Sequence, residues 1–205
     1  MIQKTIKNIV FDLGMVLVSF NWREYLDSLN FHSNIKEKMI EKVFDNMAVW
    51  NEHDRGVLSD EEFIEFASKT APEIKYPLRQ YMNGVGYICK EYPYAAEWVS
   101  SLKRRGYRVY VLSNYGKTPY QYAQRKFSFL DKIDGAVISS DVKFVKPEIE
   151  IYRCFLEKYH LKAKETVFLD DREDNIEAAE KCGIYGIIFK GYEQGKEELE
   201  KLLNS

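Results

Sequence analysis

Short apolar runs alternate along the chain with longer amphipathic stretches. Five of the apolar runs are bounded by polar or turn-forming residues, which is the pattern of strands buried in a sheet. They cover residues 6–11, 108–112, 135–139, 166–169 and 184–189, and helical patterns lie between them at residues 94–105, 118–129, 147–159 and 175–182. Strands that alternate with helices predict an α/β fold of three layers, in which helices cover both faces of a parallel sheet.

One connection is too long for a simple crossover between neighbouring strands. About 95 residues separate the first predicted strand from the second, whereas a crossover needs roughly a dozen. Helical patterns fill this connection at residues 22–29, 34–49, 59–69 and 76–89, and Ser59 with Glu62 has the spacing of a capping box. We therefore predict a small α-helical cap over residues 16–90, inserted into a core domain made of residues 1–15 and 91–205.

Polar side chains stand where four of these elements meet the loops. They are Asp12 after the first strand, Ser113 and Asn114 after the second, Lys146 before the helix that a proline opens, and Asp170 and Asp171 after the strand at 166–169. The carboxyl ends of parallel strands meet at one edge of the sheet, where ligands bind. An ionised carboxylate at the end of an apolar strand is costly unless a cation meets it. We therefore expect one polar cluster at this edge.

The chemistry of this cluster points to a metal ion and a phosphate. Asp12, Asp170 and Asp171 would repel one another if they met without a cation. Mg²⁺ prefers one or two carboxylates, a carbonyl oxygen and several waters as ligands. A phosphate group then fits as a further ligand, because Ser113 can donate a hydrogen bond to it and Lys146 can neutralise its charge. Two adjacent aspartates alone are more often a turn or a helix cap, but the four signals in this order favour a site.

In these motifs and in their order the chain resembles the haloacid dehalogenase superfamily, in the branch with a helical cap inserted after the first motif. The segment at residues 52–63 also resembles one subgroup of that branch. The subgroup includes bacterial phosphatases that act on glucose 1-phosphate and the phosphatase domain of soluble epoxide hydrolase. The resemblance covers essentially the whole chain. It implies a Rossmann-like core and a Mg²⁺-dependent phosphatase for a small phosphorylated metabolite, with a sugar phosphate such as glucose 1-phosphate favoured.

The resemblance implies roles for the acidic residues. Asp12 would be the nucleophile, which attacks phosphorus and forms an aspartyl phosphate that water then hydrolyses. Asp12, the backbone carbonyl of Gly14 and the carboxylate of Asp171 would bind Mg²⁺. Asp171 is the preferred direct ligand because it lies four residues before Asn175, the spacing of the family, and Asp170 would then stand behind it. The choice between Asp170 and Asp171 stays open at this point.

The resemblance also implies roles for the remaining residues of the motifs. Ser113 and Asn114 would hold the phosphoryl oxygens, and Lys146 would stabilise negative charge in the transition state. In the cap, we expect Arg55 to contact phosphate or sugar, because the glycine that follows it favours a tight loop. His53 is a candidate substrate-binding residue and proton donor. The alternative for both cap residues is an ordinary place on the surface or at a helix end.

Gly14 departs from the pattern of the family. Most of its phosphatases place a second aspartate two residues after the nucleophile, where it protonates the leaving alcohol and then activates water. Such a group contributes roughly 10²–10⁴-fold to the rate. Gly14 keeps its carbonyl for a metal ion but has no side chain. The subgroup that the chain resembles also includes phosphatases with glycine at this position, which implies an activity that is lower or supported by other groups. The further interpretations are a preference for acidic leaving groups, such as anomeric, aryl or acyl phosphates, and a proton supplied by a cap residue, His53 first.

Two other functions remain as alternatives. A haloacid dehalogenase uses the same nucleophile, lacks the second aspartate and needs no metal. The pair Asp170 and Asp171 together with Lys146 favours a phosphatase, and removal of metal by a chelator would separate the two activities. The second alternative is a non-catalytic protein that binds a phosphorylated ligand at a decayed site, since one side chain of the family's set is missing at Gly14.

The composition and charge of the chain limit the kinds of molecule that it is expected to bind. The 205 residues suit one core domain with an insertion, and 45% hydrophobic residues are typical of a globular chain. Thirty basic and 32 acidic residues leave a net charge of −2, so we expect binding neither to nucleic acid nor to a membrane. No apolar run approaches the ~18 residues of a membrane span. Three cysteines without a C-x-x-C pair, and no signal peptide, favour a cytoplasmic protein with reduced thiols. Nothing in the sequence indicates an oligomeric state.

Overall fold

The centre of the molecule is a five-stranded sheet in the order β5-β4-β1-β6-β7, in which all neighbouring strands are parallel. The computed structural model describes residues 6–204. The strands are β1 (Asn8–Phe11), β4 (Arg108–Ser113), β5 (Gly135–Ile138), β6 (Thr166–Asp170) and β7 (Tyr185–Ile188). The predicted α/β class and its five strands are confirmed. Residues 1–5 of the predicted core domain lie outside the described residues.

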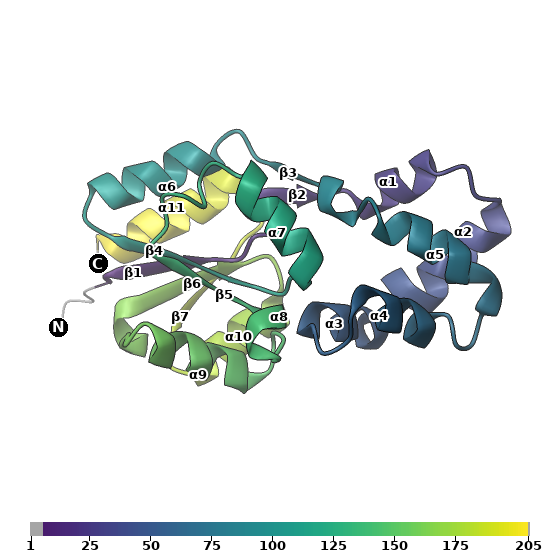
Figure 1. The fold of residues 1–205 in the computed structure, drawn as a ribbon. Helices are drawn as coiled ribbons and strands as arrows, with labels where there is room; N and C mark the ends of the chain where they lie inside the picture. The colour runs from purple at the N-terminus through teal and green to yellow at the C-terminus, as the bar shows by residue number, and fades with distance from the viewer. Residues whose placement is uncertain (1–5, 205) are drawn as a thin grey trace.

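Helices cover both faces of this sheet (Figure 1). One face carries α6 (Ala95–Arg104), α7 (Lys117–Lys126) and α11 (Tyr192–Leu203), and the other carries α9 (Ile149–Lys158) and α10 (Glu173–Lys181). Successive side chains of a strand point to opposite faces. In β1, Ile9 and Phe11 therefore pack under α6, whereas Val10 packs under α9. The three predicted layers are confirmed, and α11 is a further helix that the sequence pattern did not single out.

The long connection after β1 forms a helical cap with its own apolar core. Its elements are α1 (Trp22–Ser28), α2 (Ser33–Met39), the π-helical η1 (Ile40–Phe44), α3 (Met47–Arg55), α4 (Asp60–Ala67), η2 (Pro72–Ile74), α5 (Lys75–Met82) and η3 (Val85–Tyr87). Met39, Phe63 and Tyr81 are fully buried in this cluster. Strands β2 (Val18–Phe20) and β3 (Cys89–Glu91) pair antiparallel and link cap to core. We propose that the domains divide near residues 16 and 90.

The predicted helix at 34–49 is broken, which changes what the cap presents to the core. The chain leaves η1 at Asp45, and the Asn46 side chain accepts a hydrogen bond from the Val49 backbone N–H at 3.4 Å to cap a new helix, α3. Asparagine favours caps over helix interiors, because its side chain competes with backbone hydrogen bonds. The break turns α3 toward the core domain, where it packs against α8 (Ser139–Val142) (Figure 1).

Other cap predictions hold in part. The capping box of α4 is confirmed, because Ser59 Oγ accepts from the Glu62 backbone N–H and Glu62 accepts from the Ser59 backbone N–H at 2.8 Å. The predicted helix at 76–89 ends at Met82, and the rest of that stretch forms η3 and the start of β3. A short 3₁₀ turn, η4 (Ala163–Glu165), leads into β6.

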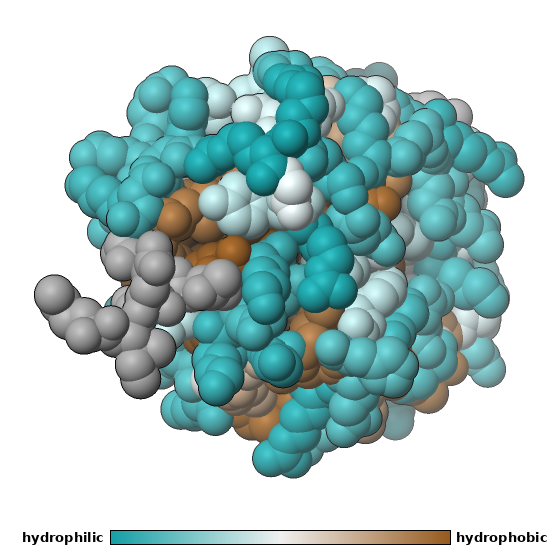
Figure 2. All heavy atoms as spheres, turned by 90° about the vertical axis from the view of Figure 1, so that its left-hand side faces the viewer, coloured by the Kyte–Doolittle hydropathy of each residue, from teal (hydrophilic) through white to brown (hydrophobic). Residues whose placement is uncertain are grey.

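The cap lies over the carboxyl ends of the sheet strands (Figure 1). The opposite end of the core domain is covered mainly by hydrophilic side chains, with apolar side chains showing between them (Figure 2). Among residues 6–204, no helix has the length and apolarity needed to cross a membrane. Cys89, Cys154 and Cys182 are free thiols. The fold therefore places the expected site between the carboxyl edge of the sheet and the cap.

Candidate functional site

Asp12 is the first residue beyond β1, and its backbone is fixed before its side chain leaves the sheet. Its N–H donates to the Leu169 carbonyl at 2.9 Å, which continues the ladder between β1 and β6 by one step. The carboxylate oxygen Oδ1 lies 2.9 Å from Lys146 Nζ. Burial raises the pKa of Asp12, the charge of Lys146 lowers it, and the charge of Asp170 raises it. The net result is a pKa of about 6. The carboxyl group is thus held in a nearly dry position at the sheet edge.

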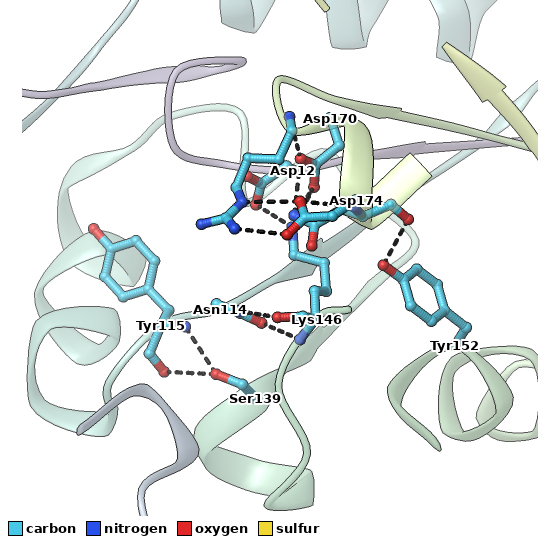
Figure 3. A network of polar contacts seen from close by, with 10 residues as sticks. Asp12, Asn114, Tyr115, Ser139, Lys146, Tyr152, Asp170 and Asp174 are labelled. Carbon is cyan, nitrogen blue, oxygen red and sulfur yellow. Dashed lines mark hydrogen bonds and ion pairs between the residues drawn. The ribbon is translucent and has the colours of Figure 1, made fainter. Parts of the chain in front are cut away.

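Lys146 joins Asp12 to Asp170 across this edge (Figure 3). Its Nζ lies 2.6 Å from Asp170 Oδ2 as well as 2.9 Å from Asp12, and the lysine is buried. Burial lowers the pKa of Lys146, but the two carboxylates outweigh this effect and raise it. The ammonium group therefore stays protonated between two acidic groups, which is the arrangement that a developing negative charge requires.

Asn114 positions Lys146 through its backbone. The amide oxygen of Asn114 accepts from the Lys146 N–H at 2.7 Å, and its Nδ2 donates to the Lys146 carbonyl at 3.0 Å (Figure 3). The sequence analysis expected Asn114 to hold phosphoryl oxygens, and its side chain also lines the cavities described below. Ser113, at the end of β4, is buried and lines the smaller cavity with Asp12. Both residues thus stand beside the carboxylate and the ammonium group.

Asp170 is held on both oxygens by protein groups. Asn175 Nδ2 donates to Oδ1 at 2.9 Å and to Oδ2 at 3.1 Å, and the Arg172 N–H donates to Oδ1 at 2.9 Å. Asp170 is fully buried, whereas the neighbouring Asp171 is exposed. Partial burial raises the pKa of Asp171, and the charge of Asp170 adds to this effect. Asp171 is therefore the carboxylate of the pair with room for an additional partner.

The three carboxylates form a group with the chemistry of a divalent cation site. Ligand oxygens of Asp12, Asp170 and Asp171 all lie within 4.8 Å of one another. Hard cations such as Mg²⁺ take oxygen ligands, while zinc sites in proteins usually include imidazole or thiolate. Burial raises the pKa of Asp12 and of Asp171, and the charge of Asp170 adds to the rise in both. The donor set fits a hard cation that would supply the missing positive charge.

Two adjoining cavities separate this polar cluster from the cap. The larger has a volume of about 220 Å³ and the smaller about 110 Å³. Asp12 and Asn114 line both cavities from the core domain, and Phe20, Trp50 and Asp54 line both from the cap side. The larger cavity also contacts Lys146 and the smaller contacts Gly14 and Ser113. A small ester can therefore meet the carboxylate, the ammonium group and aromatic walls together.

His53 lies on α3 and lines the smaller cavity with Asp12 and Gly14. Its Nδ1 is 3.4 Å from Asp54 Oδ1 and its Nε2 is 3.7 Å from Asp60 Oδ1. Burial lowers the pKa of His53, but its interactions with these two aspartates outweigh burial and raise the pKa to about 9. The imidazole is therefore charged at neutral pH and is surrounded by cap carboxylates.

The titration of His53 predicts a pH-dependent stability. The folded protein holds this proton with a pKa of about 9, against an ordinary value of 6.5, so the stabilisation is complete below pH 6.5 and is lost as the pH rises to about 9. We expect the free energy of unfolding in urea to fall over this interval, and His53→Gln to flatten the fall. The exposed His32 provides the control, and a His32→Gln variant with the same flattening would contradict the assignment.

Arg55 is placed at the contact between cap and core. Its guanidinium makes a bidentate ion pair with Glu148, at 2.7 and 3.0 Å, and donates to the Lys143 carbonyl at 3.1 Å. Within the described residues it lines neither of the two cavities. The structure therefore brings Asp12, Gly14, Ser113, Asn114, Lys146 and His53 to the cavities and Asp170 and Asp171 to the acidic group, but it engages Arg55 elsewhere.

Asp54 lines both cavities but was not among the site residues predicted from the sequence. It lies between His53 and Arg55, which were both predicted to bind substrate. Its local sequence does not distinguish it from an acidic residue on the solvent-facing side of a helix. Its side chain is 13% exposed and lines both cavities opposite Asp12. The signal that would have identified it is helical spacing, since Met47, Trp50 and Asn51 lie on the same face of α3 and also line the larger cavity.

The sequence of this chain is similar to a known hydrolase family and to curated phosphatases. A family model described as haloacid dehalogenase-like hydrolase matches residues 6–183. D-ribitol-5-phosphate phosphatase of Bacteroides thetaiotaomicron is 26% identical over 98% of this chain and 100% of its own length. A sesquiterpene phosphatase of Aspergillus oryzae is 25% identical over 89% of each chain. Some other curated relatives are much longer, and this chain spans 37% or 19% of them.

Solved structures have a similar fold over most of this chain. The magnesium complex of a HAD family enzyme from Bacteroides thetaiotaomicron is 27% identical, with a TM-score of 0.72 over 91% of this chain and 94% of that one. A dehalogenase with 20% identity has a TM-score of 0.67 over 88% of this chain and 83% of that one. At that identity the second likeness concerns the fold alone. The first adds a magnesium-binding neighbour with the same architecture.

Proposed function

The chain belongs to the haloacid dehalogenase-like hydrolase family, and from this premise we propose that it hydrolyses small phosphate monoesters with Asp12 as the nucleophile. It is a phosphatase-type hydrolase, as its full-length relatives are. The observation that carries the proposal is the buried Lys146, whose Nζ lies 2.9 Å from Asp12 and 2.6 Å from Asp170 at the edge of the cavities. A cation fixed beside the attacking carboxylate is what transfer of an anionic group requires.

In this proposal Asp12 carries the phosphoryl group in two steps. Its carboxylate oxygen attacks phosphorus, the bond from phosphorus to the ester oxygen breaks, and an aspartyl phosphate forms on the side chain. Water then attacks phosphorus, which releases inorganic phosphate and restores the carboxylate. Lys146 remains paired with Asp12 and stabilises the charge on the phosphoryl oxygens, while Ser113 donates a hydrogen bond to them. The fixed backbone of Asp12 keeps the attacking oxygen aimed into the cavity.

We assign the metal site to Asp12, Asp171 and the carbonyl of Gly14, with Asp170 behind them. Mg²⁺ bound there would offset the charge of the carboxylates and of the phosphate and would polarise the phosphoryl group. Asp170 already accepts from Lys146, Asn175 and Arg172, whereas the exposed Asp171 has room for the ion. The acidic group within 4.8 Å and the magnesium complex of the similar Bacteroides enzyme support the assignment.

A sugar phosphate such as glucose 1-phosphate is the substrate class we favour. The larger cavity, about 220 Å³, is smaller than the roughly 300–1,000 Å³ of drug-sized ligand sites, which suits a small metabolite. Aromatic rings of Phe20, Trp22 and Trp50 line it, and such rings pack against the apolar faces of sugars while polar groups bind the hydroxyls. Hydrolysis of a panel of phosphorylated metabolites in Mg²⁺ tests the class, and a failure of every sugar phosphate would refute it.

Removal of metal separates this function from a dehalogenase. We expect a chelator such as EDTA to lower the phosphatase rate by at least about 10²-fold, because the ion supplies several kcal/mol of charge stabilisation. Addition of Mg²⁺ in excess of the chelator should restore the rate. Release of inorganic phosphate and of halide from 2-haloacids would be measured in parallel. Halide release that persists in chelator, with no phosphate release in Mg²⁺, would favour the dehalogenase instead.

A further inference from the structure

The cavity next to Asp12 has an opening where phosphatases of this family carry a second aspartate. A Cβ built on Gly14 would have no heavy atom of the described residues within 4 Å. The position is thus open, and Gly14 itself can neither protonate a leaving group nor accept a proton from water. A proton donor for this reaction must come from another wall of the same cavities. Asp54, on the cap side, is the carboxyl group that lines both of them with Asp12.

The spacing of residues along α3 places Asp54 on the helix face that lines the larger cavity. Met47, Trp50, Asn51 and Asp54 are spaced by three, one and three residues and all line the larger cavity. Residues at this spacing share one face of a helix. The first three present apolar or neutral polar groups, so Asp54 is the acid of this face. Its side chain is 13% exposed, which leaves it accessible from the cavity but largely shielded from bulk water.

The backbone of Asp54 is anchored to the core domain. Its carbonyl accepts from Ser139 Oγ at 2.5 Å, and the same Oγ accepts from the Tyr115 N–H at 2.9 Å. Figure 3 shows Ser139, the first residue of α8, beside Tyr115 and Asn114, which lie in the loop that follows β4. The end of α3 is therefore fastened to the loop that carries Ser113 and Asn114. Groups that transfer protons need such a fixed position relative to the reacting atoms.

Two further contacts hold the end of α3 in place. Arg55 makes its bidentate ion pair with Glu148, and Glu148 Oε2 accepts from the Val145 N–H at 3.1 Å, next to Lys146 in the chain. Lys143 Nζ donates to the Gly56 carbonyl. These contacts connect the residues that flank Asp54 to the segment that carries Lys146. Asp54 thus has a defined place over Asp12 while the cap is seated on the core.

His53 supplies a proton store directly behind Asp54. Its Nδ1 lies 3.4 Å from Asp54 Oδ1 and is shielded from solvent, because the ring packs against Gly116, where a Cβ would come within 2.2 Å of it. Asp60 faces the other nitrogen at 3.7 Å, and Cys89 and Tyr115 also lie close to this pair. The buried ring can therefore exchange a proton with Asp54 through Nδ1 without contact with bulk solvent.

We propose that Asp54 is the proton donor and acceptor of the reaction and takes the place of the aspartate missing at Gly14. The inference rests on the proposed phosphatase function. As the bond between phosphorus and the ester oxygen breaks, that oxygen takes a proton from Asp54 in the same step in which Asp54 takes one from His53 Nδ1, and the alcohol leaves neutral. When water attacks the aspartyl phosphate, Asp54 accepts its proton and returns it to His53. The cycle gains and loses no proton overall.

Leaving-group acidity gives the sharpest test of this role. Phenyl and p-nitrophenyl phosphate have similar shapes, but phenol is the weaker acid and needs its proton more as the bond breaks. We expect Asp54→Asn to lower kcat/KM for phenyl phosphate by about 10²–10⁴-fold and to change kcat/KM for p-nitrophenyl phosphate by no more than about threefold in Mg²⁺. This ratio reports the steps up to release of the alcohol, whereas hydrolysis of the aspartyl phosphate is common to both esters and affects kcat alone. Asp27→Asn is the matched control, because Asp27 is a cap aspartate whose side chain is 75% exposed and lines neither cavity among the described residues. It should leave the ratio of the two rates unchanged.

The open position at Gly14 allows a rescue. In the Asp54→Asn background, Gly14→Asp places a carboxyl group where the family carries one and should restore phenyl phosphate hydrolysis at least about tenfold. An equal loss of kcat/KM on both esters, or no loss of kcat/KM on phenyl phosphate, would overturn the role of Asp54 and leave the proposed function intact. A wild-type protein that cleaves p-nitrophenyl but not phenyl phosphate would do the same. Failure of the wild type on every ester in Mg²⁺ would overturn both proposals.

Discussion

Replacement of Asp12 by asparagine is expected to lower the phosphatase kcat by about 10⁴-fold or more, because a carboxamide does not act as a nucleophile toward phosphorus. The loss should be the same for phenyl and p-nitrophenyl phosphate, since the first chemical step fails whatever the leaving group is. Substrate binding should largely persist, because Lys146 and Ser113 remain beside the cavities. Rapid-quench assays of phosphate release would measure the residual rate, and labelled phosphate on the protein would report the intermediate.

The same substitution should leave the protein folded. Burial raises the pKa of Asp12 to about 6, so the site disfavours the ionised carboxylate relative to a neutral group. A neutral carboxamide of the same shape is therefore expected to keep or raise Tm. Asp27→Asn, at an exposed cap position whose side chain is 75% accessible, is the control for changing one aspartate to asparagine. Substantial turnover by Asp12→Asn with phosphate still released would contradict the role of Asp12.

The residues at the sheet edge could be predicted from the sequence because topology alone brings them together. Asp12 and Ser113 end adjacent parallel strands, and Asp170 ends β6 on the other side of β1. Each apolar run shows where its strand ends, and parallel strands share one carboxyl edge. The cluster then follows without knowledge of any side-chain contact. The detailed partners do not follow in this way, as Asn114 demonstrates by binding the Lys146 backbone.

The cap was less predictable, because its placement depends on tertiary contacts. The apolar pattern over residues 34–49 favours one helix, but the Asn46 cap ends it and starts α3 in a new direction. The direction of α3 decides that Asp54 faces the cavity and that Arg55 faces Glu148. Neighbouring residues on a helix differ in direction by about 100°, so a small change in docking would exchange these roles. Sequence pattern finds the helix but does not fix its docked rotation.

Replacement of Lys146 by methionine is expected to lower kcat/KM by about 10³-fold at neutral pH. One part of the loss comes from charge stabilisation in the transition state, where removal of a single positioned donor costs roughly 10²–10³-fold. The other part comes from Asp12, because the charge of Lys146 lowers its pKa. Without that charge the pKa of Asp12 rises above 6, so a smaller fraction of the protein carries the ionised nucleophile. The acidic limb of the pH profile of kcat/KM should therefore move to higher pH.

This shift in pH separates the role of Lys146 in catalysis from one in folding alone. Removing one partner of a buried ion pair costs about 3–5 kcal/mol of stability, so Lys146→Met should also lower Tm, and rates must be compared well below it. A merely structural role would lower the amount of active protein without moving the acidic limb. Lys162→Met is the control, since that lysine side chain is 69% exposed and pairs with Glu165 far from the site. An acidic limb that stays in place in Lys146→Met would mean that the ammonium group does not set the ionisation of Asp12.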